Sequence, residues 1–101
     1  MTGLTGKQKR FLRGLGQRLE PSVALGKSGM TPAIVTAVGE QLSRRELIKV
    51  RLPAGPGRAR RASAEALAAA AEASCAGVVG RTALLYRPNP DLPARERLAL
   101  P

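Results

Sequence analysis

Apolar and polar residues alternate along this chain with two spacings, one typical of helices and the other typical of strands. The first helix is predicted to begin with a capping box, in which the side chains of Thr5 and Gln8 each accept the other's backbone N–H. Its apolar face repeats at helical spacing and is formed by Phe11, Leu12, Leu15 and Leu19. Glu20 and Pro21 then end the helix, because a residue that precedes proline is forced into extended backbone.

A strand, a glycine turn and a second helix follow. Ser22–Leu25 is predicted to be a short buried strand, and Gly26–Gly29 is predicted to be a turn with the sequence Gly-Lys-Ser-Gly. The helix should run from Pro32 to about Ser43, with Thr31 as its N-cap.

The next strand is predicted over Glu46–Leu52. Its apolar residues alternate with Lys49 and Arg51, so that one face is buried and the other is basic. The segment Pro53–Arg61 is rich in proline and glycine, and we expect it to be a flexible loop that carries three arginines.

An alanine-rich helix and a hairpin complete the predicted elements. Ser63 can cap a helix over Ala64–Ser74, which Gly77 ends. Val78–Tyr86 is predicted to be a hairpin, with Gly80 at the first central position of a two-residue turn.

This order, α-β-α-β-α-β-β, describes one α/β domain of the two-layer α+β kind over residues 1–88, followed by a proline-rich extended tail over residues 89–101. A chain of 101 residues has room for one modest core. No apolar run approaches membrane-spanning length, and the first residues are not an apolar signal sequence. We therefore expect a soluble protein of the cytoplasm.

The charge balance narrows the classes of function. Lys and Arg number 17 against 7 Asp and Glu, which gives a net charge of +10. Such a balance favours a polyanionic partner, most often nucleic acid and less often an anionic membrane. The chain has no histidine and one cysteine, Cys75, which we expect to be a core residue at the end of the alanine-rich helix. This composition argues against an enzyme, a bound metal, a cofactor or an intrachain disulfide.

The turn Gly26, Lys27, Ser28 and Gly29 is the candidate binding element. A strand that turns through glycines into a helix start exposes backbone N–H groups, and the helix dipole and Lys27 add positive charge. Such a turn attracts phosphate oxygens. The alternative, equally open from the tetrad alone, is a tight turn that needs glycine at positive φ.

The same residues resemble the end of a nucleotide-binding P-loop, but two features argue against that reading. Pro21 stands where the motif needs its first glycine. The later apolar runs also end in no carboxylate that could help to hold magnesium.

Basic residues on three predicted elements are candidates for an electrostatic field around the turn. They are Lys7, Lys9, Arg10 and Arg13 on the first helix, Arg44 and Arg45 at the end of the second, and Lys49 and Arg51 on the strand. Simple solvation is the alternative for the first group, and interaction with the helix dipole is the alternative for Arg44 and Arg45. Whether the helix and strand cations share one surface is left open.

Four separated blocks together resemble the CRM domain, named for chloroplast RNA splicing and ribosome maturation, and its bacterial YhbY-like members. The blocks are Leu4–Arg10, Pro21–Gly29, Glu46–Arg51 and Leu84–Pro88. The resemblance implies a four-stranded mixed sheet packed by three helices, similar to the C-terminal domain of translation initiation factor 3. It also implies RNA binding through the Gly-x-x-Gly loop and an association with precursors of the large ribosomal subunit.

The leading hypothesis is therefore a monomeric RNA-binding assembly factor for the large ribosomal subunit, with no small-molecule substrate. The aromatic residues are Phe11 and Tyr86, both expected in the core, so recognition should rest on phosphates and RNA shape. A general basic RNA-binding or ribosomal protein is the alternative, and a nucleotide-binding enzyme is a third.

Overall fold

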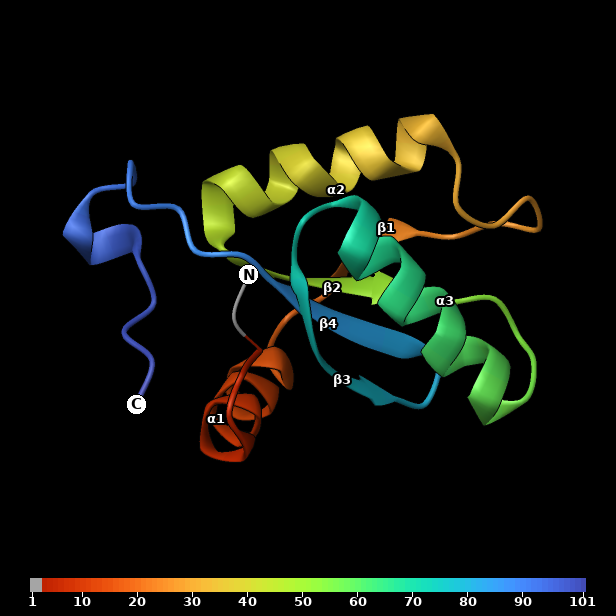
Figure 1. The fold of residues 1–101 in the computed structure, drawn as a ribbon, viewed down its shortest axis with the longest axis horizontal. Coiled ribbons are helices and arrows are strands. Elements are labelled where there is room, and N and C mark those ends of the chain that lie inside the picture. The colour runs from red at the N-terminus through yellow and green to blue at the C-terminus, as the bar shows by residue number, and fades with distance from the viewer. Residues whose placement is uncertain (1–2) are drawn as a thin grey trace.

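The computed structural model describes residues 3–101, and the elements follow one another in the predicted order (Figure 1). They are α1 (Gly6–Gly16), β1 (Pro21–Ala24), α2 (Pro32–Arg45), β2 (Leu47–Arg51), α3 (Gly57–Ala70), β3 (Ser74–Val79), β4 (Thr82–Tyr86) and the 3₁₀ turn η1 (Ala94–Glu96). The predicted capping box at Thr5 and Gln8 is present.

The strands form one mixed sheet in the order β1-β2-β4-β3. β1 runs parallel to β2, whereas β4 is antiparallel to both of its neighbours. This confirms the mixed four-stranded sheet, and it leaves β1 and β3 as the two edges.

Helices cover both faces of the sheet, so the fold has three layers and not the two that we expected (Figure 1). α2 and α3 pack on one face, where Val38 and Leu67 join the core cluster around Ile48. α1 packs on the other face, where Leu12 joins the cluster around Leu47. Because neighbouring strand residues point to opposite faces, the burial of both Leu47 and Ile48 requires a cover on each side.

α3 begins at Gly57 and not at Ala64, so the prediction of a flexible loop over residues 53–61 is wrong from Gly57 onward. Pro56 is the N-cap and provides no side-chain hydrogen bond. Arginine and alanine are among the best helix formers, and their propensity makes the segment that contains Arg58, Arg60 and Arg61 helical. These arginines therefore stand on the first turns of a helix.

β3 begins soon after α3 ends, so the expected position of Cys75 at the end of a helix is also wrong. Glu72 turns the chain with a positive φ of 57°. Cys75 then pairs with Leu85 of β4. Strand pairing has outweighed the helix propensity of the alanine-rich segment.

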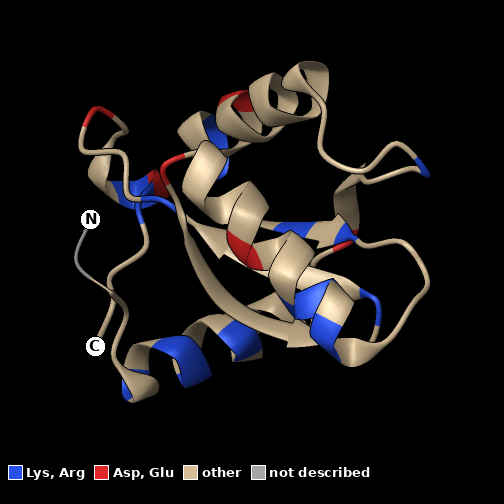
Figure 2. Cartoon of the chain, turned by 45° about the vertical axis from the view of Figure 1, so that its right-hand side comes forward, with Lys and Arg blue, Asp and Glu red and all other residues tan. Residues whose placement is uncertain are grey.

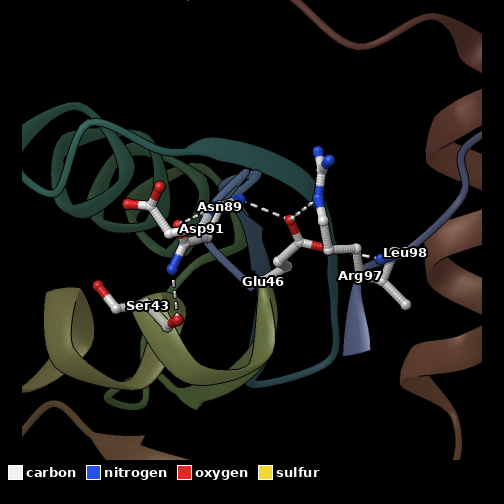
Figure 3. Close-up of polar contacts among 6 residues, drawn as sticks. All are labelled: Ser43, Glu46, Asn89, Asp91, Arg97 and Leu98. Carbon is white, nitrogen blue, oxygen red and sulfur yellow. Dashed lines mark hydrogen bonds and ion pairs between the residues drawn. The ribbon is translucent and has the colours of Figure 1, made fainter. Parts of the chain in front are cut away.

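The C-terminal residues, expected to form an extended tail, return to the domain at Glu46 (Figure 3). Glu46 is fully buried at the C-cap of α2, with φ of 63°. Its carboxylate accepts the backbone N–H of Asn89 and that of Leu98, the latter at 2.6 Å, and lies 3.6 Å from Nε of Arg97. Leu98 and Leu100 pack against the cluster that α1 covers. One carboxylate thus holds the tail at two points.

Candidate nucleic-acid interface

The Gly26–Gly29 segment is a tight turn between β1 and α2. Gly29 N–H donates to Gly26 O at 2.9 Å, and Gly29 has φ of +69°, a conformation that favours glycine. Gly26, Lys27 and Ser28 are exposed. A Cβ added at Gly26 or Gly29 would meet no atom within 4 Å, so the turn presents open backbone to the solvent.

The start of α2 offers fewer free donors than the sequence suggested. Thr31 is the N-cap as predicted, and its hydroxyl oxygen accepts the N–H of Ile34 at 3.2 Å. Val35 N–H donates to Thr31 O, and Pro32 has no N–H. Within the described residues, the backbone N–H of Ala33 is therefore the free donor of the first turn of α2. Most backbone donors for an anion would come from the glycine turn itself.

One cation of α1 and one of β2, Arg13 and Lys49, share a surface, which answers in part the question that the sequence left open. A hollow of about 220 Å³ lies between them and is lined by both Arg13 of α1 and Lys49 of β2. The backbone of Arg51, farther along β2, accepts the N–H of Leu25 at 2.9 Å, immediately before Gly26. A basic path, defined by Arg13, Lys49 and Arg51, therefore leads from α1 across β2 to the end of β1 before the glycine turn, and Glu20 lines a hollow with Arg51 beside it.

One further cation of α1, Lys9, lies near Arg13, because both line another hollow. Lys7 and Arg10 are exposed on α1, and Lys9 is half-buried. Lys and Arg positions follow α1, β2 and the first turns of α3 in Figure 2.

Arg44 and Arg45 do not join this surface. They are exposed at the C-terminal end of α2, whose 14 residues separate them from the glycine turn by about 20 Å. This position suits the alternative given from the sequence, a favourable interaction with the negative end of the helix dipole.

Two cationic sites near the path were not among the sequence candidates. Arg61 of α3 lines a second hollow together with Lys9 and Arg13. Arg81, in the turn between β3 and β4, accepts the N–H of Leu52 at 2.6 Å through its backbone oxygen, which places this turn beside the end of β2. The sequence did contain a signal for Arg61. Because arginine favours helices, the arginines after Gly57 could have been assigned to the start of α3, which would have indicated a basic first part of that helix.

The two aromatic residues differ in position. Tyr86 is buried as expected, and burial together with the nearby charge of Glu46 raises the pKa of its phenol. Phe11, also expected in the core, is 38% exposed, and Leu15 on the same helix is 37% exposed. Both are exposed because Leu12 is the α1 residue that faces the sheet. One exposed ring does not make a stacking platform for bases.

Residues 3–101 contain no group of three or more His, Cys, Asp or Glu side chains that could hold a metal ion. None of the helices in this range is long and apolar enough to cross a membrane.

Comparison with known proteins defines the class. The sequence profile of the CRS1 / YhbY (CRM) domain matches residues 4–87. An RNA-binding protein of Haemophilus influenzae is 33% identical over 91 residues, which cover 90% of this chain and 92% of that protein. The probable RNA-binding protein YqeI of Bacillus subtilis is 35% identical over 88 residues, covering 87% and 92%.

The fold agrees with the sequence match. A solution structure from Staphylococcus aureus, described as that of a candidate RNA-binding protein, has a TM-score of 0.82 and 32% identity over 97% of this chain and 99% of that chain. The chain belongs to the CRS1 / YhbY (CRM) domain family.

Proposed function

We propose that this protein binds structured RNA in the cytoplasm through the Gly26–Gly29 turn and the adjoining basic surface, and that it acts in assembly of the large ribosomal subunit. The observation that carries the proposal is the basic path from Arg13 through Lys49 and Arg51 to the exposed glycine turn. The relatives named as RNA-binding proteins support RNA as the polyanion.

The chemistry of this surface suits phosphate and not base edges. Lysine and arginine neutralise phosphates, and open glycine backbone allows close approach of phosphate oxygens. One amide side chain, Gln17, lines the hollow together with Arg13 and Lys49, and a single amide is little material for reading adenine edges. Recognition would therefore depend on the shape of the RNA backbone, with little preference for sequence.

A protein with this chemistry needs a structured and phosphate-dense target. A partly folded ribosomal subunit offers such a surface for a limited time. The resemblance to bacterial CRM proteins supports the large subunit.

A sucrose gradient of cell lysate with immunodetection of the tagged protein tests the biological role. At moderate salt, so that electrostatic contacts survive, the protein should co-sediment with large-subunit precursors and be scarce on translating ribosomes. Its loss should cause immature large subunits to accumulate, most visibly at low temperature. Sedimentation with the small subunit, or one copy per mature ribosome, would replace the assembly role with that of a general ribosomal protein.

A further inference from the structure

A trough runs along β3, the edge strand, between α1 and α3. Two hollows of about 280 and 320 Å³ share Lys9, Glu65 and Cys75 in their linings. Together they extend over β3 from Ser74 to Val79, a span of about 20 Å for six residues. The trough is therefore one continuous feature and not two isolated dents.

The charge of this trough is mainly positive. Lys9 and Arg13 contribute from α1, and Arg61 contributes from α3. Glu65 is the one acidic residue among its lining residues. Three cations thus converge from two helices on a recessed strand.

Arg13 is held in a defined place over the strand. Its side chain lies against Gly77, where an added Cβ would come within 2.9 Å of Cδ and 3.3 Å of Cγ of Arg13. Its guanidinium nitrogen Nη1 lies 3.5 Å from Ala76 O. An arginine lying across Ala76 and Gly77 obstructs the addition of a further peptide strand at this edge, but leaves a fixed positive charge for an anion.

We propose that the trough is a second RNA-binding site, which holds the phosphate backbone between α1 and α3 separately from the glycine turn. The inference rests on the proposed function, because it takes RNA as the ligand. Arg13 lines both the trough and the hollow that contains Lys49, so RNA in the trough can continue toward the glycine turn.

Cys75, the one cysteine of the chain, is a built-in reporter because it lines both hollows of the trough. The full chain is treated with iodoacetamide at pH 8 in the presence and absence of an in vitro transcript of large-subunit ribosomal RNA. With RNA at about ten times its Kd, alkylation should slow by about tenfold, because only the free fraction reacts.

Two charge reversals of equal size provide the matched comparison. Arg61→Glu changes the trough, whereas Arg95→Glu changes an exposed residue of η1 that lines neither of its hollows. Arg61→Glu should weaken RNA binding and make the slope of log K against log salt shallower by about 0.7–0.9, the value for one phosphate contact. Arg95→Glu should preserve the wild-type salt slope and the protection of Cys75.

The outcomes separate this inference from the proposed function. RNA that binds the wild-type protein without slowing alkylation of Cys75 overturns the trough and leaves the glycine turn as the site. Protection by polyglutamate but not by RNA also overturns it, in favour of an acidic protein partner. A wild-type protein that binds no RNA overturns the proposed function itself.

Discussion

Replacement of Glu46 by alanine is expected to release the C-terminal tail and to lower the free energy of unfolding by about 3–5 kcal/mol. The fully buried carboxylate accepts the backbone N–H groups of Asn89 and Leu98. Each N–H left without a partner costs about 1–3 kcal/mol, which supplies most of this loss. Arg97 adds little, because its side chain is 41% exposed.

The backbone at this position allows a sharper comparison. Glu46 has φ of 63°, a conformation that costs about 1–2 kcal/mol for residues other than glycine. Glu46→Gly should therefore be less destabilising than Glu46→Ala, although both remove the carboxylate. Glu96→Ala, which removes an exposed acid of the tail, is the matched control and should change stability by less than about 0.5 kcal/mol.

Urea unfolding measures these losses, and amide hydrogen exchange locates them. In the wild-type protein the N–H groups of Asn89 and Leu98 should be protected, and in Glu46→Ala both should exchange rapidly. Unchanged protection of these two groups, or an unfolding free energy within about 0.5 kcal/mol of wild type, would refute the role assigned to Glu46.

Four further predictions concern binding and pH. If about four to six cations neutralise phosphates, a plot of log K for RNA binding against log salt concentration should have a slope of about −3 to −5. A flat plot together with a strong sequence preference would contradict phosphate recognition. Lys27→Ala should weaken RNA binding and Gly29→Asp should weaken it more, with circular dichroism as the control for folding; wild-type binding by folded Gly29→Asp would make the segment a turn only. Calorimetry should detect no magnesium-dependent binding of ATP or GTP, because Pro21 replaces the P-loop glycine, and micromolar binding abolished by Lys27→Ala would reverse that conclusion. Because burial raises the pKa of Tyr86, the neutral phenol stabilises the fold below about pH 10 and this contribution is lost as the pH rises through the folded pKa. Wild type should therefore lose more stability above pH 10 than Tyr86→Phe, and parallel losses would contradict this.

Local signals in the sequence were sufficient for the elements that they define directly. The capping box at Thr5, the N-cap at Thr31 and the alternation along β2 each depend on neighbouring residues, and the structure contains all three. The start of α3 was misplaced because Ser63 resembles an N-cap, whereas the helix propensity of the preceding arginines extends the helix to Gly57.

Long-range contacts explain what the sequence could not show. Glu46 looked like the first residue of a strand, but its carboxylate binds residues more than 40 positions away. The joint surface of Arg13 and Lys49 exists because α1 covers the second face of the sheet, and periodicity does not specify which face a helix covers. The sequence also could not show how far Arg44 lies from the glycine turn, because that distance depends on the length of α2 between them.

Crosslinking of the tagged protein to RNA in cells, followed by sequencing of the contacts, tests the central claim most directly. Lys27→Glu, in the turn before α2, and Arg44→Glu, at the C-terminal end of α2, make the same change of charge. The account predicts contacts in large-subunit ribosomal RNA for wild type and for Arg44→Glu, and their loss in Lys27→Glu. Equal loss in both variants, or wild-type contacts confined to other RNA, would contradict it.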